Sequence, residues 1–461
     1  MKMRLLGQAA LWIIVLGTFW PRPAQAQTYS VLFNFGTSNG DPYYPPAPGT
    51  IAQGRDGNLY TTTEFGGVEG VGAAFRVTTT GKLSLLHSFN ETHGGENPSS
   101  GLTLGTDGSL YGTTQSGGPS QGVIFKLTPS GKYAILYRFS GYPPDGGLPE
   151  AAPIEGTDGN FYGTAYQGGE QTFGSVYKLT RSGKFSTLYS FDSTTGVDLN
   201  TPLVQGRDGN LYGTTSQGGT RGYGTVFKIT PTGKLTVLYN FDFTHGNQST
   251  APLIQASDGI FYGTTTGGGT TNFGVIFSIT SKGVLNVLHN FSGSDGIMPR
   301  GGLVQASDGK LYGTSAEGGT QGCGTIFVMD LEGTFSKLYD FDYTTGCGPQ
   351  VSLLQHTNGV LYGDTDDGGS GSEGVFYSFD VDLRPFVRLL PASSKIGETI
   401  GILGQGFKGT TRVAFNGTDA SFTVVSGTYL TTTVPNGATT GFVTVTTPKG
   451  KLKSDKKFRV Q

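Results

Sequence analysis

The sequence lacks the short motifs that usually reveal an enzyme. No P-loop or Cys-x-x-Cys occurs among its 461 residues, and the five histidines lack the spacing of metal ligands. Only 14% of the residues are charged, which is too little for a disordered chain, and the 78 glycines lack the strict period of collagen. The composition therefore favours a folded protein with many turns between short strands.

Long apolar runs are also missing, except near the N-terminus. There Lys2 and Arg4 precede an apolar run over residues 11–16, and residues 24–26 read Ala-Gln-Ala. This order predicts a signal peptide over residues 1–26 that is cleaved after Ala26. A retained membrane anchor is the alternative, but the run is shorter than the ~20 residues that a span needs. We expect an exported protein, extracellular, at the cell surface or periplasmic, with no membrane span after cleavage.

What the chain contains instead is a long-period repeat. A tyrosine recurs at intervals of 50 or 51 residues, at Tyr60, Tyr111, Tyr162, Tyr212, Tyr262, Tyr312 and Tyr362. In the fourth copy, residues 208–215 read Asp-Gly-Asn-Leu-Tyr-Gly-Thr-Thr, and Gly218-Gly219 follow. Turn signals divide this unit into four short strands, which we expect over residues 202–205, 210–215, 225–230 and 235–241. Four antiparallel strands in 50 residues predict one blade of a β-propeller.

The two ends of the repeat region complement each other. Residues 30–35 match the fourth strand of a unit but have no other strands before them, whereas the seventh unit lacks a fourth strand of its own. If residues 30–35 fill that position, the ring closes and no sheet edge stays open. The sequence therefore predicts an all-β protein with a seven-bladed β-propeller, over residues 27–383, that is closed by an N-terminal strand.

The repeat pattern is fullest at residues 107–132 and 208–234. It resembles secreted bacterial tandem-repeat proteins known as choice-of-anchor repeats, and the resemblance covers residues 30–380. It implies export and a surface or extracellular context. It supplies no catalytic residues that could be transferred to this chain.

Charge separates a second domain from the repeat. Residues 384–461 carry eleven Lys or Arg and three acids, about +8, and the signal segment carries +3; because the whole chain is −2, residues 27–383 are near −13. Alternating segments such as 400–403, 411–415 and 441–446 predict a small β-sandwich over residues 384–461. Through residues 404–407, 413–417, 434–438 and 447–450 it resembles an IPT/TIG immunoglobulin-like domain. That resemblance implies a spacer or adhesion module.

Three groups of residues are candidate sites. Cys323 and Cys347, the only cysteines, lie in neighbouring loops of one propeller face, so we predict a disulfide. Asp364, Asp366, Asp367 and Glu373 break the repeat in unit seven; they are candidate Ca²⁺ ligands, with a solvated acidic loop as the alternative. Aromatic residues in the loops of the same face are candidate sugar-stacking positions, with packing between loops as the alternative: Phe173, Tyr223, Phe243, Phe273 and Tyr343.

These features lead to three functional hypotheses. The first is an exported binding or adhesion protein whose loop-rich propeller face holds a glycan or protein ligand, without catalysis and without a cofactor other than possible Ca²⁺. The second is an extracellular carbohydrate-active hydrolase or lyase that uses carboxylates of that face. The third is a structural component of the cell envelope. The acidic propeller argues against nucleic-acid binding.

Overall fold

The computed structural model describes residues 27–38, 40–46, 49–92, 94–117, 120–141, 143 and 145–461. Throughout these residues the secondary structure consists of strands, β1 to β37, without a helix. Consequently no described segment forms a helix that is long and apolar enough to cross a membrane. The proposed signal peptide, residues 1–26, lies outside the described residues.

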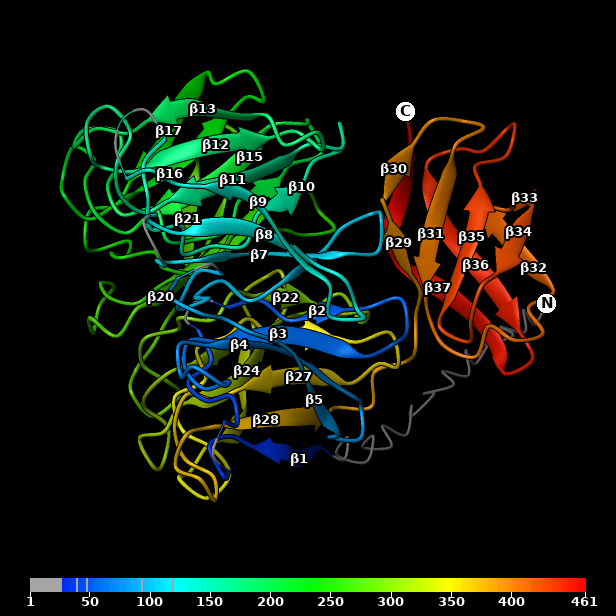
Figure 1. Ribbon diagram of the computed structural model, residues 1–461, viewed down its shortest axis with the longest axis horizontal. Coiled ribbons are helices and arrows are strands. Elements are labelled where there is room, and N and C mark those ends of the chain that lie inside the picture. The colour runs from blue at the N-terminus through cyan, green and yellow to red at the C-terminus, as the bar shows by residue number, and fades with distance from the viewer. Residues whose placement is uncertain are drawn as a thin grey trace, which may run out of the picture.

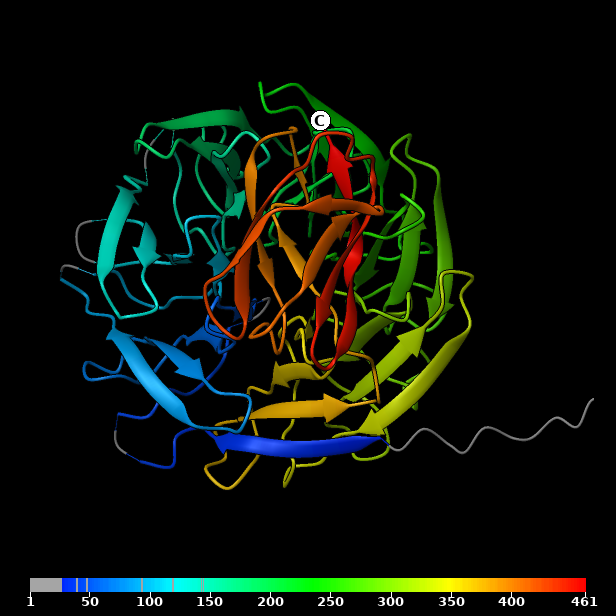
Figure 2. The ribbon, with the colours of Figure 1, turned by 90° about the vertical axis from the view of Figure 1, so that its right-hand side faces the viewer.

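The repeat folds into seven four-stranded antiparallel sheets that follow one another around a ring, in a propeller-like arrangement (Figures 1 and 2). We number these units one to seven in chain order and call their strands a to d. Units one to three consist of β2 (Ala52–Gln53), β3 (Leu59–Thr63), β4 (Ala73–Val77) and β5 (Leu83–Ser88); β6 (Thr103–Leu104), β7 (Leu110–Thr114), β8 (Val123–Leu127) and β9 (Tyr133–Arg138); and β10 (Ile154–Glu155), β11 (Phe161–Ala165), β12 (Ser175–Leu179) and β13 (Phe185–Ser190).

Units four to six consist of β14 (Val204–Gln205), β15 (Leu211–Thr215), β16 (Thr225–Ile229) and β17 (Leu235–Asn240); β18 (Ile254–Gln255), β19 (Phe261–Thr265), β20 (Val275–Ile279) and β21 (Leu285–Asn290); and β22 (Val304–Gln305), β23 (Leu311–Ser315), β24 (Thr325–Met329) and β25 (Phe335–Asp340). Unit seven consists of β26 (Leu354–Gln355), β27 (Leu361–Asp364), β28 (Val375–Asp380) and the N-terminal strand β1 (Thr28–Asn34). Strand a is shorter than expected, because only two residues of each unit pair there.

The turn between strands a and b explains the recurring aspartate and tyrosine. In unit four, the Asp208 carboxylate accepts a hydrogen bond from the backbone N–H of Asn210 at 3.2 Å, and Gly209 has a φ of 82°. The hydroxyl of Tyr212 donates to the other oxygen of Asp208 at 2.8 Å. The aspartate therefore serves the turn and satisfies a largely buried tyrosine, a pairing that the sequence pattern alone did not reveal.

Packing between the sheets explains the glycine of strand b. Gly213 lies opposite Phe227 of strand c, and a Cβ atom at Gly213 would lie 2.6 Å from the end of that ring. The ring of Phe227 in turn meets Phe191 of unit three, with 5.0 Å between the ring centroids. This aromatic residue of strand c thus joins successive sheets.

The N-terminal strand completes the last sheet. β1 pairs antiparallel with β28, from Thr28 opposite Asp380 to Asn34 opposite Val375. Tyr29 stacks on Tyr339 of unit six, with 4.4 Å between the ring centroids. The first strand of the chain therefore ties unit seven to the preceding unit and leaves no unpaired strand c.

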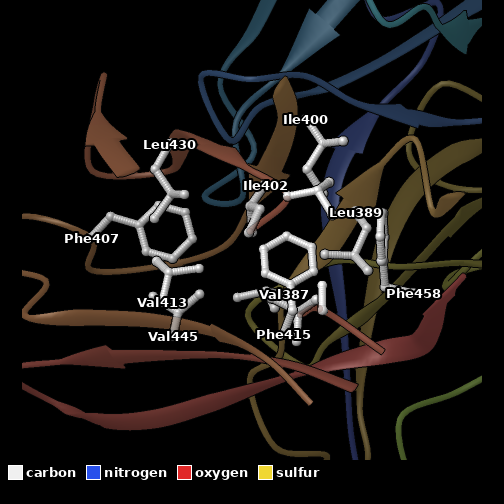
Figure 3. Close-up of a cluster of buried hydrophobic side chains, with 13 residues drawn as sticks. Val387, Leu389, Ile400, Ile402, Phe407, Val413, Phe415, Leu430, Val445 and Phe458 are labelled. Atoms are coloured by element: carbon white, nitrogen blue, oxygen red, sulfur yellow. The ribbon is translucent and has the colours of Figure 1, made fainter. Parts of the chain in front are cut away.

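The C-terminal residues form two further sheets around one hydrophobic core (Figure 3). Val387, Phe415 and Phe458 are among its fully buried side chains. One sheet has the order β29-β31-β35-β34 and the other β30-β37-β36-β32-β33. Their bounds are β29 (Arg388–Leu390), β30 (Ser393–Ser394), β31 (Thr399–Leu403), β32 (Arg412–Phe415), β33 (Thr418–Ala420), β34 (Phe422–Val424), β35 (Tyr429–Thr433), β36 (Gly441–Thr447) and β37 (Gly450–Val460).

This C-terminal unit lies over the centre of the ring, on the face that carries the a-to-b turns (Figure 2). The Arg55 guanidinium stacks 4.5 Å from the centroid of the Tyr429 ring, and the Thr428 hydroxyl donates to the Arg55 carbonyl at 2.8 Å. Gln405 donates to the hydroxyl of Thr357 at 2.9 Å. Because one face is covered in this way, the loop-rich opposite face is the accessible entrance to the centre of the ring.

Candidate functional site

A regular backbone frame surrounds the centre of the loop-rich face. In each unit, the residue just after strand b, or two places after it in unit seven, donates its N–H to the carbonyl of a residue in the loop that precedes strand a. Examples are Ser216 to Asp198 at 3.3 Å and Thr266 to Gln248 at 3.1 Å. The accepting residue has a positive φ in all seven units: Tyr44, Asn97, Leu148, Asp198, Gln248, Met298 and Gly348.

Six of these seven positions hold a residue other than glycine, although a positive φ favours glycine. Backbone strain of this kind persists where a side chain is needed or where the surroundings impose it. Three positions of each unit meet around the entrance: the positive-φ residue, the residue two places later, and the residue after strand b. We call this region the channel mouth.

The side chains at these positions do not repeat, in contrast to the frame that carries them. The residues two places after the positive-φ position are Pro46, Ser99, Glu150, Asn200, Thr250, Arg300 and Gln350. Those after strand b are Glu64, Gln115, Tyr166, Ser216, Thr266, Ala316 and Asp366. A constant frame with variable, mostly polar side chains is the pattern expected of a binding site on a repeat scaffold.

The channel mouth contains a cavity of about 290 Å³ between units three and six. Eight of its nine lining residues come from the three positions just defined, and the ninth, Gln217, follows Ser216. The lining residues are Tyr166, Asp198, Asn200, Ser216, Gln217, Gln248, Thr250, Thr266 and Arg300. The wall therefore offers hydroxyl, amide, carboxylate and guanidinium groups, and one aromatic ring.

Carboxylates distributed around the mouth change one another's pKa values. Burial, and then the nearby charge of Glu150, raise the pKa of Glu64 to about 7. Burial also raises the pKa of Glu150, partly offset by a hydrogen bond from Gln115 at 2.8 Å, and the charge of Asp198 raises it further. Burial raises the pKa of Asp198 as well, against a hydrogen bond from Tyr166. These carboxylates therefore share one electrostatic environment.

The opposite side of the mouth is organised by a short hydrogen-bond chain. Arg300 donates to the side-chain oxygen of Gln350 at 3.0 Å, and the Gln350 amide donates to Asp366. Burial raises the pKa of Asp366 to about 6, although the Gln350 hydrogen bond and the Arg300 charge act in the other direction. These hydrogen bonds hold the Arg300 guanidinium, the cation of the cavity wall, toward units six and seven.

The two predicted cysteines form a disulfide, Cys323–Cys347. It lies next to the channel mouth: the backbone N–H of Gly348 donates to the Cys323 carbonyl at 3.1 Å, and the backbone N–H of Asp366 donates to the Gly348 carbonyl at 3.2 Å. The disulfide thus fixes the loop that carries Gln350 and Asp366.

The acidic residues of unit seven do not form a single loop cluster. Asp364 is only 1% exposed, which is at odds with a solvated loop, and neither carboxylate oxygen has a hydrogen-bond partner among the described residues. Asp367 accepts from the Tyr343 hydroxyl at 2.8 Å, and Glu373 lies against Gly36. Within the described ranges, no three His, Cys, Asp or Glu side chains lie close enough together to hold a metal ion. The calcium site stays a prediction.

The predicted aromatic residues lie outside the cavity. Tyr223 and Phe243 pack edge to face, with 5.6 Å between centroids, and both rings are partly exposed. Phe273 is less exposed and lies beside Gly293, and Phe173 forms a backbone bridge to Gly168. Tyr343 is the most exposed of the five, at 59%. The structure therefore brings only Tyr223 and Phe243 together, and their role in binding stays a prediction.

Comparison with known proteins identifies the family. A family model described as the Gloeobacter/Verrucomicrobia repeat matches residues 16–205 and 200–444. The chain belongs to this family. A search of curated proteins found no match.

Several solved structures are similar to this Gloeobacter/Verrucomicrobia repeat protein at low identity. A fungal alcohol oxidase of the AA5 family in complex with copper is 15% identical with a TM-score of 0.51, and the match covers 91% of this chain and 98% of the oxidase. The extracellular domain of a protein assigned as a hybrid two-component system of B. thetaiotaomicron is 10% identical with a TM-score of 0.50, covering 90% of this chain and 46% of that one. A Bacteroides uniformis protein assigned as a 6-phosphogluconolactonase is 19% identical with a TM-score of 0.47, covering 66% and 88%.

Sequence reasoning about this Gloeobacter/Verrucomicrobia repeat protein identified one residue of the mouth, Asp366, and missed the others. The signal was present in the repeat columns, because the residue after strand b varies from Glu64 to Tyr166 to Ala316, whereas the pair of glycines that begins two places later occurs in every unit. What the sequence could not show is that these columns converge on one cavity, because they lie about 50 residues apart.

Proposed function

We propose that the protein is an exported or cell-surface binding protein that holds a glycan, or a polar segment of a protein, in the channel mouth. In this proposal the ring is a seven-bladed β-propeller closed by β1, and the C-terminal unit is an immunoglobulin-like sandwich of the IPT/TIG type. The seven four-stranded sheets and the β1–β28 pairing support the first point. The disulfide and the charged N-terminal sequence support export, as does the resemblance to choice-of-anchor repeats.

The observation that carries the proposal is the non-repeating polar cavity on a repeating frame. Ser216 and Thr266 occupy the same position in units four and five, and they line the cavity together with Thr250, Asn200 and Gln248. Such groups donate and accept hydrogen bonds, as recognition of several hydroxyl or amide groups requires. A ring that served only as an envelope component would not need polar side chains that differ from unit to unit at these positions.

A glycan array followed by calorimetric titration of the mature chain tests the proposal. We expect binding that is lost in Thr250→Trp, since an indole at this position would fill part of the cavity. Thr220→Trp is the matched control, because Thr220 is an exposed residue of the same face outside the cavity wall. Equal loss of binding in both variants, or binding that survives in Thr250→Trp, would contradict a site in the channel mouth.

One observation favours a second candidate, an extracellular carbohydrate-active hydrolase or lyase. A pKa of about 7 keeps a substantial fraction of Glu64 protonated at neutral pH, as a general acid must be. A reducing-sugar release assay on the bound glycans distinguishes the candidates. Turnover that is abolished in Glu64→Gln would favour the enzyme, whereas binding without turnover favours the binding protein.

A further inference from the structure

The channel mouth carries four carboxylates that form no ion pair among the described residues. In the described part of the chain, no Lys, Arg or His lies within ion-pair distance of Glu64, Glu150, Asp198 or Asp366. Some acids elsewhere on the ring are paired; Asp107, for example, lies 2.7 Å from the Lys126 ammonium. The mouth therefore gathers partly buried carboxylates that have no ion-pair partner among the described residues.

The one cation of the cavity wall does not neutralise this charge. Arg300 donates to Gln350, and Gln350 donates to Asp366, so the guanidinium is held on the side of units six and seven. Glu64, Glu150 and Asp198 come from units one, three and four, and none of them forms an ion pair with Arg300. A positive ligand group bound there would relieve the repulsion among these carboxylates.

A second observation points in the same direction. Asp364 occupies the strand-b position at which the other six units have threonine, and in unit five that threonine, Thr264, donates to the Pro299 carbonyl at 3.0 Å. Asp364 is buried with no hydrogen-bond partner among the described residues, and it lies close enough to Asp366 for the charge of Asp366 to raise its pKa. The unpartnered carboxyl group adds hydrogen-bond acceptors next to the unit-seven side of the mouth.

The spacing of the acids indicates an organic cation and not a single metal ion. No three of the described acidic, His or Cys side chains converge on one point, whereas Asp198 lines a polar cavity of about 290 Å³ and the other carboxylates occupy further positions of the mouth. Asn200, Gln248 and Thr250 line the same cavity as Asp198 and add acceptors there. Separated carboxylates with intervening polar acceptors match a ligand whose charged N–H donors are themselves separated.

We propose that the channel mouth selects ligands that carry protonated amines, such as oligomers of an amino sugar or polyamines. This inference rests on the proposed use of the channel mouth as the binding site. The ammonium groups bind on the side of Glu64, Glu150 and Asp198, and the hydroxyl or amide groups of the cavity wall orient the rest of the ligand.

The test uses the full mature chain and three probes in calorimetric titrations at low ionic strength and about pH 7. The probes are a tetramer of glucosamine, the same tetramer fully N-acetylated, and spermidine. We expect the amine-bearing tetramer to bind about tenfold more tightly than the acetylated one, because acetylation removes the charge. Glu150→Gln and Asp198→Asn should each weaken binding of the glucosamine tetramer and of spermidine several-fold. Glu170→Gln, an exposed acid in a loop of the same face, is the matched control and should leave both unchanged.

The possible results separate this inference from the proposed function. Equal or tighter binding of the acetylated tetramer, or amine binding that is insensitive to Glu150→Gln and Asp198→Asn, overturns the inference. If neutral glycans bind, Thr250→Trp blocks their binding, and amine-bearing ligands bind no more tightly than neutral ones, the proposed function stands and the charge inference fails. If spermidine binds with the expected dependence on Glu150 and Asp198 but no glycan or protein ligand is found, the charge inference stands and the glycan or protein assignment fails.

Discussion

Replacing Asp364 with threonine, the residue of the other six units, should stabilise the protein. Both carboxylate oxygens of Asp364 are buried without a hydrogen-bond partner in the described part of the chain. Leaving a buried polar group unsatisfied costs ~1–3 kcal/mol, so Asp364→Thr should raise the free energy of unfolding by that amount. With ~2 °C per kcal/mol for a domain of this size class, the melting temperature should rise by about 2–6 °C.

The stabilisation by Asp364→Thr should depend on pH. Burial, together with the Asp366 charge, raises the pKa of Asp364 well above its usual range. The folded state thus binds the proton more tightly than the unfolded state, in which the pKa is ~3.9. The buried Asp364 carboxyl group therefore lowers the free energy of unfolding of the wild-type chain least below the unfolded-state pKa. This loss of stability grows as the pH rises toward the folded-state pKa. The gain from Asp364→Thr should be small near about pH 4 and larger at about pH 8.

Urea denaturation at both pH values measures this difference. Thr264→Asp is the matched control: it places a carboxylate at the equivalent, fully buried position of unit five, where the Thr264 hydroxyl now donates to the Pro299 carbonyl. It should destabilise the protein, and more so at the higher pH. A neutral or destabilising Asp364→Thr at about pH 8 would refute the reasoning, since it would mean that Asp364 has a compensating interaction.

Three further predictions concern the stability of the ring. Deleting residues 27–36 removes β1 and exposes β28, so scanning calorimetry should show a strongly lowered melting temperature; an unchanged melt would rule out a closing role for β1. Cys323→Ser with Cys347→Ser should lower the unfolding free energy by ~3 kcal/mol, because the disulfide closes a loop across 24 residues of sequence, and an equally stable variant would argue against that contribution. Burial lowers the pKa of His356 to about 4, while the His356 ring lies 3.1 Å from the Gly57 carbonyl. Because the unfolded state, with a pKa of ~6.5, then binds the proton more tightly, stability should fall by up to ~3 kcal/mol as the pH drops from ~6.5 to about 4. His356→Ala should remove this acid sensitivity, and an unchanged pH dependence in that variant would contradict the assignment.

The sequence alone determined the architecture of the repeat. Hairpin signals such as Asp208-Gly209, the strand-b glycine and the aromatic residue of strand c act within one unit or between adjacent units. Because these interactions are local and repeat at a fixed period, the sequence alone predicts the repeating unit. The N-terminal strand was predictable as well, since the ring needs an equal number of each strand.

Only the tertiary structure decided where the candidate site lies. Glu64, Glu150, Asp198 and Arg300 are far apart in sequence and have no common motif; Asp198 and Arg300 line one cavity, and Glu150 acts electrostatically on Glu64, because the ring brings loops of different units toward one axis. Asp364 illustrates the same limit. Its substitution for threonine is visible in the sequence, but its complete burial, and the absence of a partner for it among the described residues, arise from the packing of unit seven. Local patterns specify a blade, whereas burial and convergence are properties of the closed ring.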